Sequence, residues 1–388
     1  MDEVRNPFAP GAGSQPPELA GREDIIRDAE TALHRVLRGR PAQSQMLLGL
    51  RGVGKTVLLN TIERLADETG FVTSFIEAPE SRTLPELLYP KLFQALRKLS
   101  VVENAKAKAH SAMRALRSFA SVFKLGVGDL ELSVDPEPGV ADSGNFEYDL
   151  TDLIITVGEA ARAAGKGWAL LIDEVQYLSE SELAALIVAL HRASQKSLPI
   201  IFFGAGLPQI AALSGDAKSY AERLFLFPRV DALDRTAAER AIRDPIEEEG
   251  EQIDEEAIDA IFEATHGYPY FLQEWGYQAW NSAERSPIAA ACLEQAGDHA
   301  LRRLDAGFFK VRFERLTPKE REYVLAMARL GEGPYRSAEV ADLLGETHNS
   351  LGPRRATIIH KGMIYSPAHG DIAFTVPMFE DYLRRHWL

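Results

Sequence analysis

The most informative segment of this 388-residue chain is QMLLGLRGVGKTVLL, residues 45–59. Its first four residues are apolar or neutral, and residues 49–56 fit the pattern GxxxxGK[ST]. A helical pattern of apolar residues follows through Val57, Leu58 and Ile62. A strand that passes through a glycine-rich loop into a helix is the context in which this pattern binds phosphate groups.

The loop chemistry predicts an ATP site. Glycines let the backbone curl so that successive N–H groups converge on one anion, and the helix N-terminus adds positive potential. We expect Lys55 to reach the β- and γ-phosphates and the Thr56 hydroxyl to hold Mg²⁺. Arg51 occupies a variable position of the motif, and we expect its side chain to be solvated. The expected nucleotide-binding residues of this segment are Gly49, Gly52, Val53, Gly54, Lys55, Thr56 and Val57.

A second motif follows about 120 residues later, where the apolar run WALLID, residues 168–173, is followed by Glu174. A continuous apolar run predicts a strand buried on both faces, and acids at the carboxyl end of a parallel strand face the ligand crevice. We therefore expect Asp173 to hold Mg²⁺ and Glu174 to polarise the attacking water. The alternative is that the two acids only cap the next helix. The expected catalytic residues are Lys55, Asp173 and Glu174, with ATP and Mg²⁺ as cofactors.

Strand-like and helical segments alternate through the first 230 residues, which predicts an α/β P-loop NTPase with a parallel sheet, of the ASCE type. An alanine-rich basic helix, followed by a hairpin or loop at 123–139, interrupts this rhythm. After residue 231 the pattern is helical, and the last part shows three helices and then two strands, as in a winged helix-turn-helix. The expected domains are a flexible lead at 1–20, the ATPase core at 21–230 with an insertion at about 101–145, a helical lid at 231–312 and a winged helix at 313–388.

The composition is that of a globular protein, with 46% apolar and 26% charged residues. The net charge of -14 disfavours a general nucleic-acid coat but leaves room for local basic surfaces. One cysteine, Cys292, cannot form an internal disulfide, which favours a reducing, cytoplasmic setting. No apolar run approaches 18 residues, so we expect no membrane partner.

The chain resembles the AAA+/STAND-type P-loop ATPases, closest to the archaeal-ATPase and origin-recognition-like branch, over residues 18–388. Besides the two motifs above, four segments carry the resemblance: AGRE at 20–23, PIIFFGAGLP at 199–208, YAERLF at 220–225 and HGYPYF at 266–271. The resemblance implies that Arg22 packs near the adenine and that Pro269 touches the nucleotide.

The resemblance also implies a catalytic role for Arg223 near the γ-phosphate, in its own or a neighbouring subunit. The alternative is an exposed arginine that packs only its stem. The family usually places Asn, Ser or Thr at the end of the strand in 199–208, to orient the water. Here the strand ends in Gly204-Ala205-Gly206, which implies slow hydrolysis.

Two segments are candidates for contact with double-stranded DNA. In the expected winged helix, Pro353 suits the first position of the third helix, which would place Arg354 and Arg355 in its first turn, with Lys361 at its end. We expect an anion beside these arginines, either a DNA phosphate or an acid of the acidic stretch 231–260. The other candidate is the basic stretch 91–124, which holds eight basic residues and one acid. A solvated face or a partner surface is the alternative.

Two functions of different classes follow from these motifs. The first is an ATP-hydrolysing switch, in which the nucleotide state sets the orientation of the lid and the winged helix. The second is a nucleotide-stabilised binding module with little or no hydrolysis. A nucleotide-dependent homo-oligomer or a protein partner is compatible with both.

Overall fold

The computed structural model describes residues 1–11, 16–125, 136 and 138–388. They form two units. Unit 1 consists of Met1–Arg22, Leu50–Gly54 and Asp231–Leu388, and unit 2 consists of Glu23–Gly49 and Lys55–Val230. Most of the hairpin or loop expected at 123–139 lies outside the described residues.

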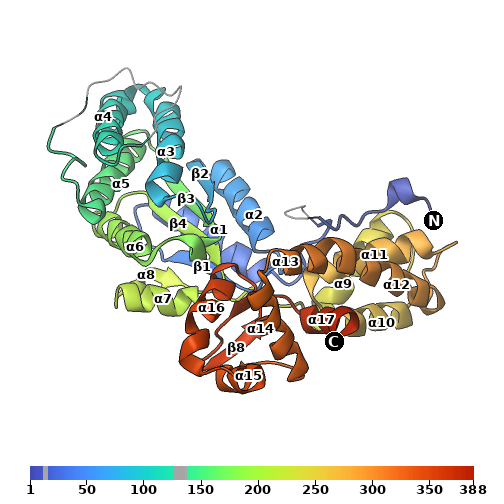
Figure 1. Ribbon diagram of the computed structural model, residues 1–388. Helices are drawn as coiled ribbons and strands as arrows, with labels where there is room; N and C mark the ends of the chain where they lie inside the picture. The colour runs from blue at the N-terminus through green and yellow to red at the C-terminus, as the bar shows by residue number, and fades with distance from the viewer. Residues whose placement is uncertain (12–15, 126–135, 137) are drawn as a thin grey trace. The chain divides into compact units, whose positions relative to one another are not determined.

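Unit 2 is built on a five-stranded parallel sheet with the strand order β2-β3-β4-β1-β5 (Figure 1). Every residue of β1 and β3 is buried, which is why these strands read as continuous apolar runs rather than as alternating patterns. The strands are β1 (Ser44–Leu48), β2 (Phe71–Glu77), β3 (Gly167–Asp173), β4 (Ile200–Gly206) and β5 (Phe225–Leu226).

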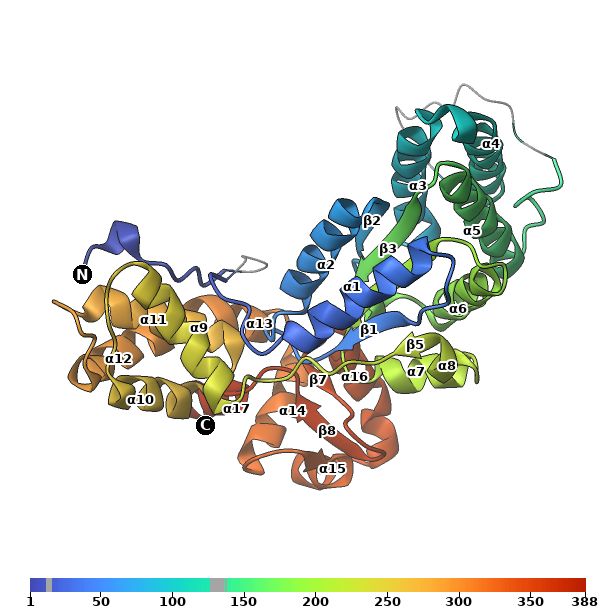
Figure 2. The ribbon, with the colours of Figure 1, turned by 180° about the vertical axis from the view of Figure 1, so that it is seen from behind.

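Helices cover both faces of this sheet, with α1 and α2 on one face and α5 and α6 on the other (Figures 1 and 2). No helix in the described part of the chain is long and apolar enough to cross a membrane. The helices of unit 2 are α1 (Glu23–Leu37), α2 (Lys55–Thr69), α3 (Leu84–Ser100), α4 (Lys106–Val122), α5 (Phe146–Ala163), α6 (Glu180–Gln195), α7 (Ile210–Ala217) and α8 (Ala221–Leu224).

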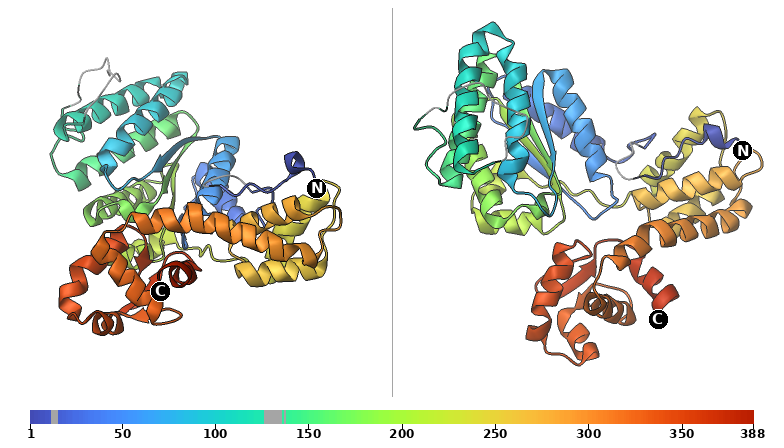
Figure 3. Two further views of the ribbon diagram at one scale, coloured as in Figure 1. Left: turned by 45° about the vertical axis from the view of Figure 1, so that its right-hand side comes forward. Right: turned by 45° about the horizontal axis from the view of Figure 1, so that its top comes forward.

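The basic helix expected within the insertion is α4, which packs beside α3 and α5 (Figure 3). Its buried face includes Leu116 and Phe119, and the Phe119 ring lies 4.7 Å from that of Phe123. Lys106 and Lys108 are exposed, and Lys108 pairs with Glu159 on α5 at 2.8 Å. The apolar face of α4 thus belongs to the core of unit 2, and its basic face is turned to solvent.

The strand register brings the two sequence motifs to one edge of the sheet. Leu48 at the end of β1 pairs with Gly206 of β4, and Ile172 of β3 pairs with Gly204. Because all these strands are parallel, their carboxyl ends meet at the same edge. The loop that begins at Gly49 and the acid Asp173 therefore lie at the same edge of unit 2.

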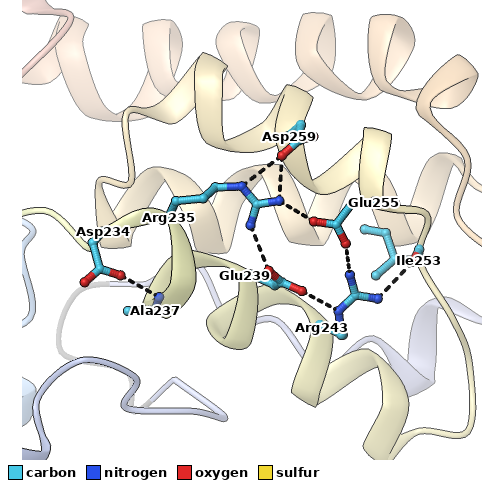
Figure 4. Close-up of polar contacts among 8 residues, drawn as sticks. All are labelled: Asp234, Arg235, Ala237, Glu239, Arg243, Ile253, Glu255 and Asp259. Carbon is cyan, nitrogen blue, oxygen red and sulfur yellow. Dashed lines mark hydrogen bonds and ion pairs between the residues drawn. The ribbon is translucent and has the colours of Figure 1, made fainter.

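Unit 1 contains a helical module at residues 231–314, whose acidic stretch is organised by two arginines (Figure 4). Arg235 bonds Glu239, Glu255 and Asp259 at 3.1, 2.6 and 2.5 Å, and Arg243 bonds Glu239 and Glu255. Shared carboxylates tie the first two helices of the module together. Its elements are α9 (Arg235–Glu248), α10 (Glu255–Thr265), α11 (Pro269–Ser282), α12 (Leu293–Arg303), a π-helical segment (Leu304–Phe309) and α13 (Lys310–Glu314).

The prediction of a flexible N-terminal lead is wrong for residues 1–11, which pack on α11. The Trp280 indole N–H donates to the carbonyl of Asp2 at 2.8 Å, and the Asn6 amide donates to the carbonyl of Tyr277 at 3.0 Å. Phe8 is 3% exposed and lies against Gly276, where an added Cβ would come within 2.6 Å of its ring. A buried aromatic anchor and backbone hydrogen bonds outweigh the Pro- and Gly-rich composition.

The C-terminal module, residues 315–388, has its first three helices where the sequence predicts helices, a fourth helix at its end, and an antiparallel sheet with the order β6-β8-β7. The expected start of the third helix is wrong: α16 begins five residues before Pro353, because Thr347 caps it by accepting the N–H of Ser350 at 3.2 Å. The elements are α14 (Pro318–Arg329), β6 (Tyr335–Arg336), α15 (Ser337–Leu344), α16 (His348–His360), β7 (Ile364–Tyr365), β8 (Asp371–Phe374) and α17 (Phe379–Trp387).

Candidate nucleotide-binding site

The loop between β1 and α2 has the backbone geometry of a phosphate cradle. Gly52 and Gly54 have φ values of 86° and 94°, which side-chain-bearing residues rarely adopt, so glycine is required at both positions. Lys55 is the first residue of α2 and is buried, and its ammonium donates to the carbonyl of Gly49 at 3.0 Å. The side chain of Val57 is buried in the core, so only its backbone N–H can serve a ligand.

The structure joins Thr56 to Asp173 although 117 residues separate them. The Thr56 hydroxyl donates to Oδ2 of Asp173 at 2.5 Å, and the N–H of Glu174 donates to Oδ1 at 2.8 Å. Asp173 is 3% exposed, and burial raises the pKa of its carboxyl despite the hydrogen bond from Thr56. The two residues expected to hold Mg²⁺ are thus in direct contact.

This pair fits a magnesium ion. A hydroxyl and a carboxylate are the hard oxygen donors that Mg²⁺ prefers, and the ion usually completes its coordination with water and substrate phosphates. Within the described residues no cluster of three or more His, Cys, Asp or Glu side chains could hold a metal ion on its own. The site therefore suits an ion that arrives with a polyphosphate.

Glu174 lies beside Asp173 in the left-handed region, with φ 56°, at the start of the short 3-10 helix Val175–Tyr177. Its carboxylate accepts a hydrogen bond from the side-chain amide of Gln176. Sequence reasoning missed Gln176, because a polar residue two positions after an acid carries no chemical signature. The glycines at the end of β4 were the available signal, since they leave space for a neighbouring side chain.

Residues Leu50–Gly54 of the loop belong to unit 1, where they contact the start of α11. The carbonyl of Gly52 accepts the N–H of Tyr270 at 3.2 Å, and an added Cβ at Gly52 would lie 3.1 Å from the ring of Tyr268. Pro269, between these tyrosines, is the first residue of α11. The segment 266–271 thus packs on the phosphate loop. The expected contact between Pro269 and the nucleotide stays a prediction.

Arg22 is buried in unit 1 and tied to the same loop. Its guanidinium donates to the carbonyl of Val53 at 3.4 Å and to that of Asp231. These bonds join the segment before α1, the loop and the start of the helical module. The expected adenine contact of Arg22 stays a prediction.

The expectation that Arg51 is solvated is wrong. Its backbone N–H donates to the carbonyl of Thr375 at 3.4 Å, and its side chain packs on Gly362, where an added Cβ would lie 2.9 Å from the Cζ atom of Arg51. Thr375 in turn donates its hydroxyl to the carbonyl of Gly362 at 2.7 Å. A variable position of the loop is therefore held by the corner of the C-terminal module where α16 ends.

A second arginine, Arg312 of α13, adds positive charge beside Arg51. Burial, with a smaller contribution from the nearby charge of Arg51, lowers the pKa of Arg312 to about 10. The guanidinium lies 3.7 Å from the centroid of the Phe308 ring, and within the described chain no carboxylate pairs with it. The hydroxyl of Tyr268 is buried nearby and has no hydrogen-bond partner among the described residues. An anion at this place would relieve the repulsion between the arginines.

Arg223 lies near the amino-terminal ends of the strands, whereas the phosphate loop follows their carboxyl ends. Arg223 is exposed in α8, two residues before Phe225, which pairs with Ser44 at the amino end of β1. The phosphate loop follows the carboxyl end of β1, so the strand separates the two. This placement disfavours contact with the same subunit's nucleotide, and a role across subunits stays a prediction.

The three candidate DNA-binding residues are engaged within the C-terminal module or close to it. Arg354 pairs with Glu346 at 3.0 Å and Lys361 with Glu320 at 2.7 Å. Arg354 and Arg355 also face the buried Tyr323, whose pKa is raised by burial to about 12. The acid beside Arg354 is thus Glu346 and not one from 231–260, and the DNA contact itself stays a prediction.

A comparison with protein families supports the assignment of an ATPase core to the first half of the chain. Residues 18–203, slightly less than half of the chain, match the AAA ATPase domain family. Residues 306–383 match a domain of unknown function, DUF8462. No curated protein matches the chain.

Solved structures resemble the chain over nearly its whole length. The Walker-type ATPase PABY2304 of Pyrococcus abyssi is 18% identical, with a TM-score of 0.56, over 94% of this chain and 96% of that one. The Orc1 protein of Aeropyrum pernix in complex with DNA is 13% identical, with a TM-score of 0.48, over 98% and 96%. The 18% identity of the first bears on the fold alone, and the TM-score of 0.48 for the second is too low to support an argument. The chain therefore has the parallel-sheet α/β fold of the AAA+ P-loop ATPases.

Proposed function

We propose that this protein is a slow ATPase that works as a switch, in which the bound nucleotide sets the state of the helical module and the C-terminal module. We interpret the C-terminal module as a winged helix, from its first three helices and its antiparallel strands. ATP and Mg²⁺ are the proposed ligands of the loop 49–56. Double-stranded DNA, a protein partner and a second copy of the chain are the candidate targets of the switch.

The observation that carries this proposal is the double attachment of the phosphate loop. The carbonyl of Gly52 accepts the N–H of Tyr270 at the start of α11, and Arg51 donates its backbone N–H to Thr375 and packs its side chain on Gly362 of the C-terminal module. A ligand charge at the loop would act directly on the Arg51–Arg312 pair, whose mutual repulsion it compensates. The loop can therefore report its occupancy to both modules through neighbouring residues.

The proposed reaction assigns one task to each side chain. Lys55 would neutralise phosphate charge, and Thr56 and Asp173 would hold Mg²⁺, which when bound would supply further stabilisation of charge on the phosphates. Glu174 accepts a proton from water while the water oxygen bonds to the γ-phosphorus. The bond between that phosphorus and the β–γ bridging oxygen breaks, which yields ADP and inorganic phosphate.

Phosphate release separates the switch from the module that only binds nucleotide. We expect slow, Mg²⁺-dependent turnover of ATP by the wild type, measured with and without double-stranded DNA. Glu174→Gln should keep the ATP affinity and lower turnover about 100-fold or more, the scale expected for a positioned base. A wild type that binds ATP but releases no phosphate under any of these conditions would favour the binding module.

Two glycines offer a matched test of the coupling. Gly362 and Gly345 both have φ 64° and both lie just after helices of the C-terminal module. Alanine at either position carries a similar backbone cost of about 1–2 kcal/mol. Of these two, Gly362→Ala would displace Arg51, whereas an added Cβ at Gly345 would meet no atom of the described residues within 4 Å.

Hydrogen exchange of residues 362–375 is the readout of that test. We expect exchange in the wild type and in Gly345→Ala to differ between the ATP-bound and ADP-bound states. Gly362→Ala should abolish most of this difference, and Arg51→Ala should abolish it without a backbone change. Equal exchange in both nucleotide states of the wild type would refute the switch and leave ATP binding intact.

A further inference from the structure

The side chain of Gln176 connects the ends of two neighbouring strands. Its Oε1 accepts the N–H of Leu207, the residue after β4, at 3.2 Å. Its Nε2 donates to Oε2 of Glu174, which follows β3. An amide oxygen only accepts hydrogen bonds and an amide nitrogen only donates them. The bond from Leu207 therefore orients the amide so that its donor faces Glu174.

The glycine end of β4 provides the space for this bridge. An added Cβ at Gly206 would lie 2.9 Å from Oε1 of Gln176 and 3.7 Å from its backbone nitrogen. A side chain at this position would push the amide away from Leu207. The end of β4 has no polar side chain of its own, and it accommodates the side-chain amide of Gln176 instead.

We propose that Gln176 is a positioning residue for Glu174, which it holds by one carboxylate oxygen at the edge of the sheet. This inference rests on the proposed hydrolysis, because it assigns Glu174 the role of base. A carboxylate held at Oε2 keeps Oε1 available for the proton of the attacking water. Without the amide, the side chain of Glu174 could rotate away from the position at which it takes that proton.

Two substitutions of similar length separate positioning from a merely structural bridge. Gln176→Glu keeps an oxygen acceptor for Leu207 but removes the donor to Glu174 and places a like charge beside it. Gln176→Met removes both hydrogen bonds and adds no charge. If only the link to Leu207 matters, Gln176→Met will be impaired and Gln176→Glu will resemble the wild type.

Positioning predicts a different pattern. Both variants should have the Kd for ATP of the wild type and a lower kcat. For Gln176→Glu we expect kcat to fall about 100-fold, the scale of a misplaced catalytic group. The control is Gln195→Glu, which adds the same charge at an exposed site at the end of α6 and should retain the kcat of the wild type. Gln176→Glu should cause no further loss in the Glu174→Gln background, because the base is already absent there.

A readout without nucleotide tests the contact itself. The exchange of the two groups, Glu174→Gln with Gln176→Glu, restores one donor and one acceptor with their direction reversed. Its melting temperature should therefore exceed that of Gln176→Glu alone. No recovery in the exchanged variant, or wild-type kcat in Gln176→Glu, would overturn the inference. Absence of turnover in the wild type would overturn the proposed hydrolysis as well, so the two failures are distinguishable.

Discussion

Replacing Asp173 by Asn should make the nucleotide-free protein more stable at neutral pH. Asp173 is 3% exposed, and its pKa is raised because the cost of burying its charge, together with repulsion from the Glu174 charge, exceeds the gain from its hydrogen bonds and Lys55. Asn is nearly isosteric and carries no charge. Its oxygen can accept the N–H of Glu174, and its NH₂ group can donate to the Thr56 hydroxyl, which then acts as the acceptor.

The pH dependence gives this prediction a definite sign. A carboxyl whose pKa is higher in the folded than in the unfolded protein destabilises the fold as pH rises from its ordinary value of about 3.8. The advantage of Asp173→Asn should therefore be absent at low pH and complete above the folded-state pKa. We expect a gain of the order of 1 kcal/mol, the scale for buried polar groups, and a rise in melting temperature of about 2–4 °C.

Thermal unfolding between pH 4 and pH 8, without nucleotide, measures this effect. The control is Asp149→Asn in the same unit, where the carboxylate is 1% exposed. It accepts the N–H and hydroxyl of Ser143 on one oxygen and the N–H of Gly144 on the other. Asn would turn a donor toward a donor there and should lower the melting temperature. A lower melting temperature for Asp173→Asn at pH 7.5 would refute our account of its burial.

Three further predictions concern ligand binding. Lys55→Ala should abolish tight ATP binding in a titration of the folded variant, because we expect the Lys55 ammonium to neutralise the β- and γ-phosphates. An unchanged affinity would contradict the proposed site. Arg223→Ala should leave the ATP and ADP affinities of the isolated subunit equal to those of the wild type, and mixing it with Lys55→Ala should partly restore turnover only if Arg223 acts across subunits. If the C-terminal module binds double-stranded DNA, Arg354→Ala with Arg355→Ala should reduce the salt dependence of binding by about one to two units while ATP affinity stays the same. An unaltered salt slope would exclude these arginines from the DNA contact.

Local patterns in the sequence predict the phosphate loop and the strand that ends in Asp173. Gly52, Gly54 and Lys55 lie within four residues of one another, so their spacing alone specifies the turn and the helix start. The continuous apolar run before Asp173 indicates a strand buried on both faces, and the alternation of strands and helices then predicts the parallel sheet. These inferences need only the backbone periods and the chemistry of neighbouring residues.

The sequence alone could not reveal contacts between residues far apart in the chain. The bond between Thr56 and Asp173 and the contact of Arg51 with Gly362 depend on how the strands and helices pack. Packing also decided that Gln176 fills the space beside Gly206 and that Arg223 lies at the opposite edge of the sheet from the loop. Local cues misled where a competing contact was stronger: Thr347 caps α16 ahead of Pro353, and Phe8 anchors a Pro- and Gly-rich terminus. Sequence spacing specifies local backbone geometry, whereas the partners of a side chain follow from the three-dimensional packing of the whole unit.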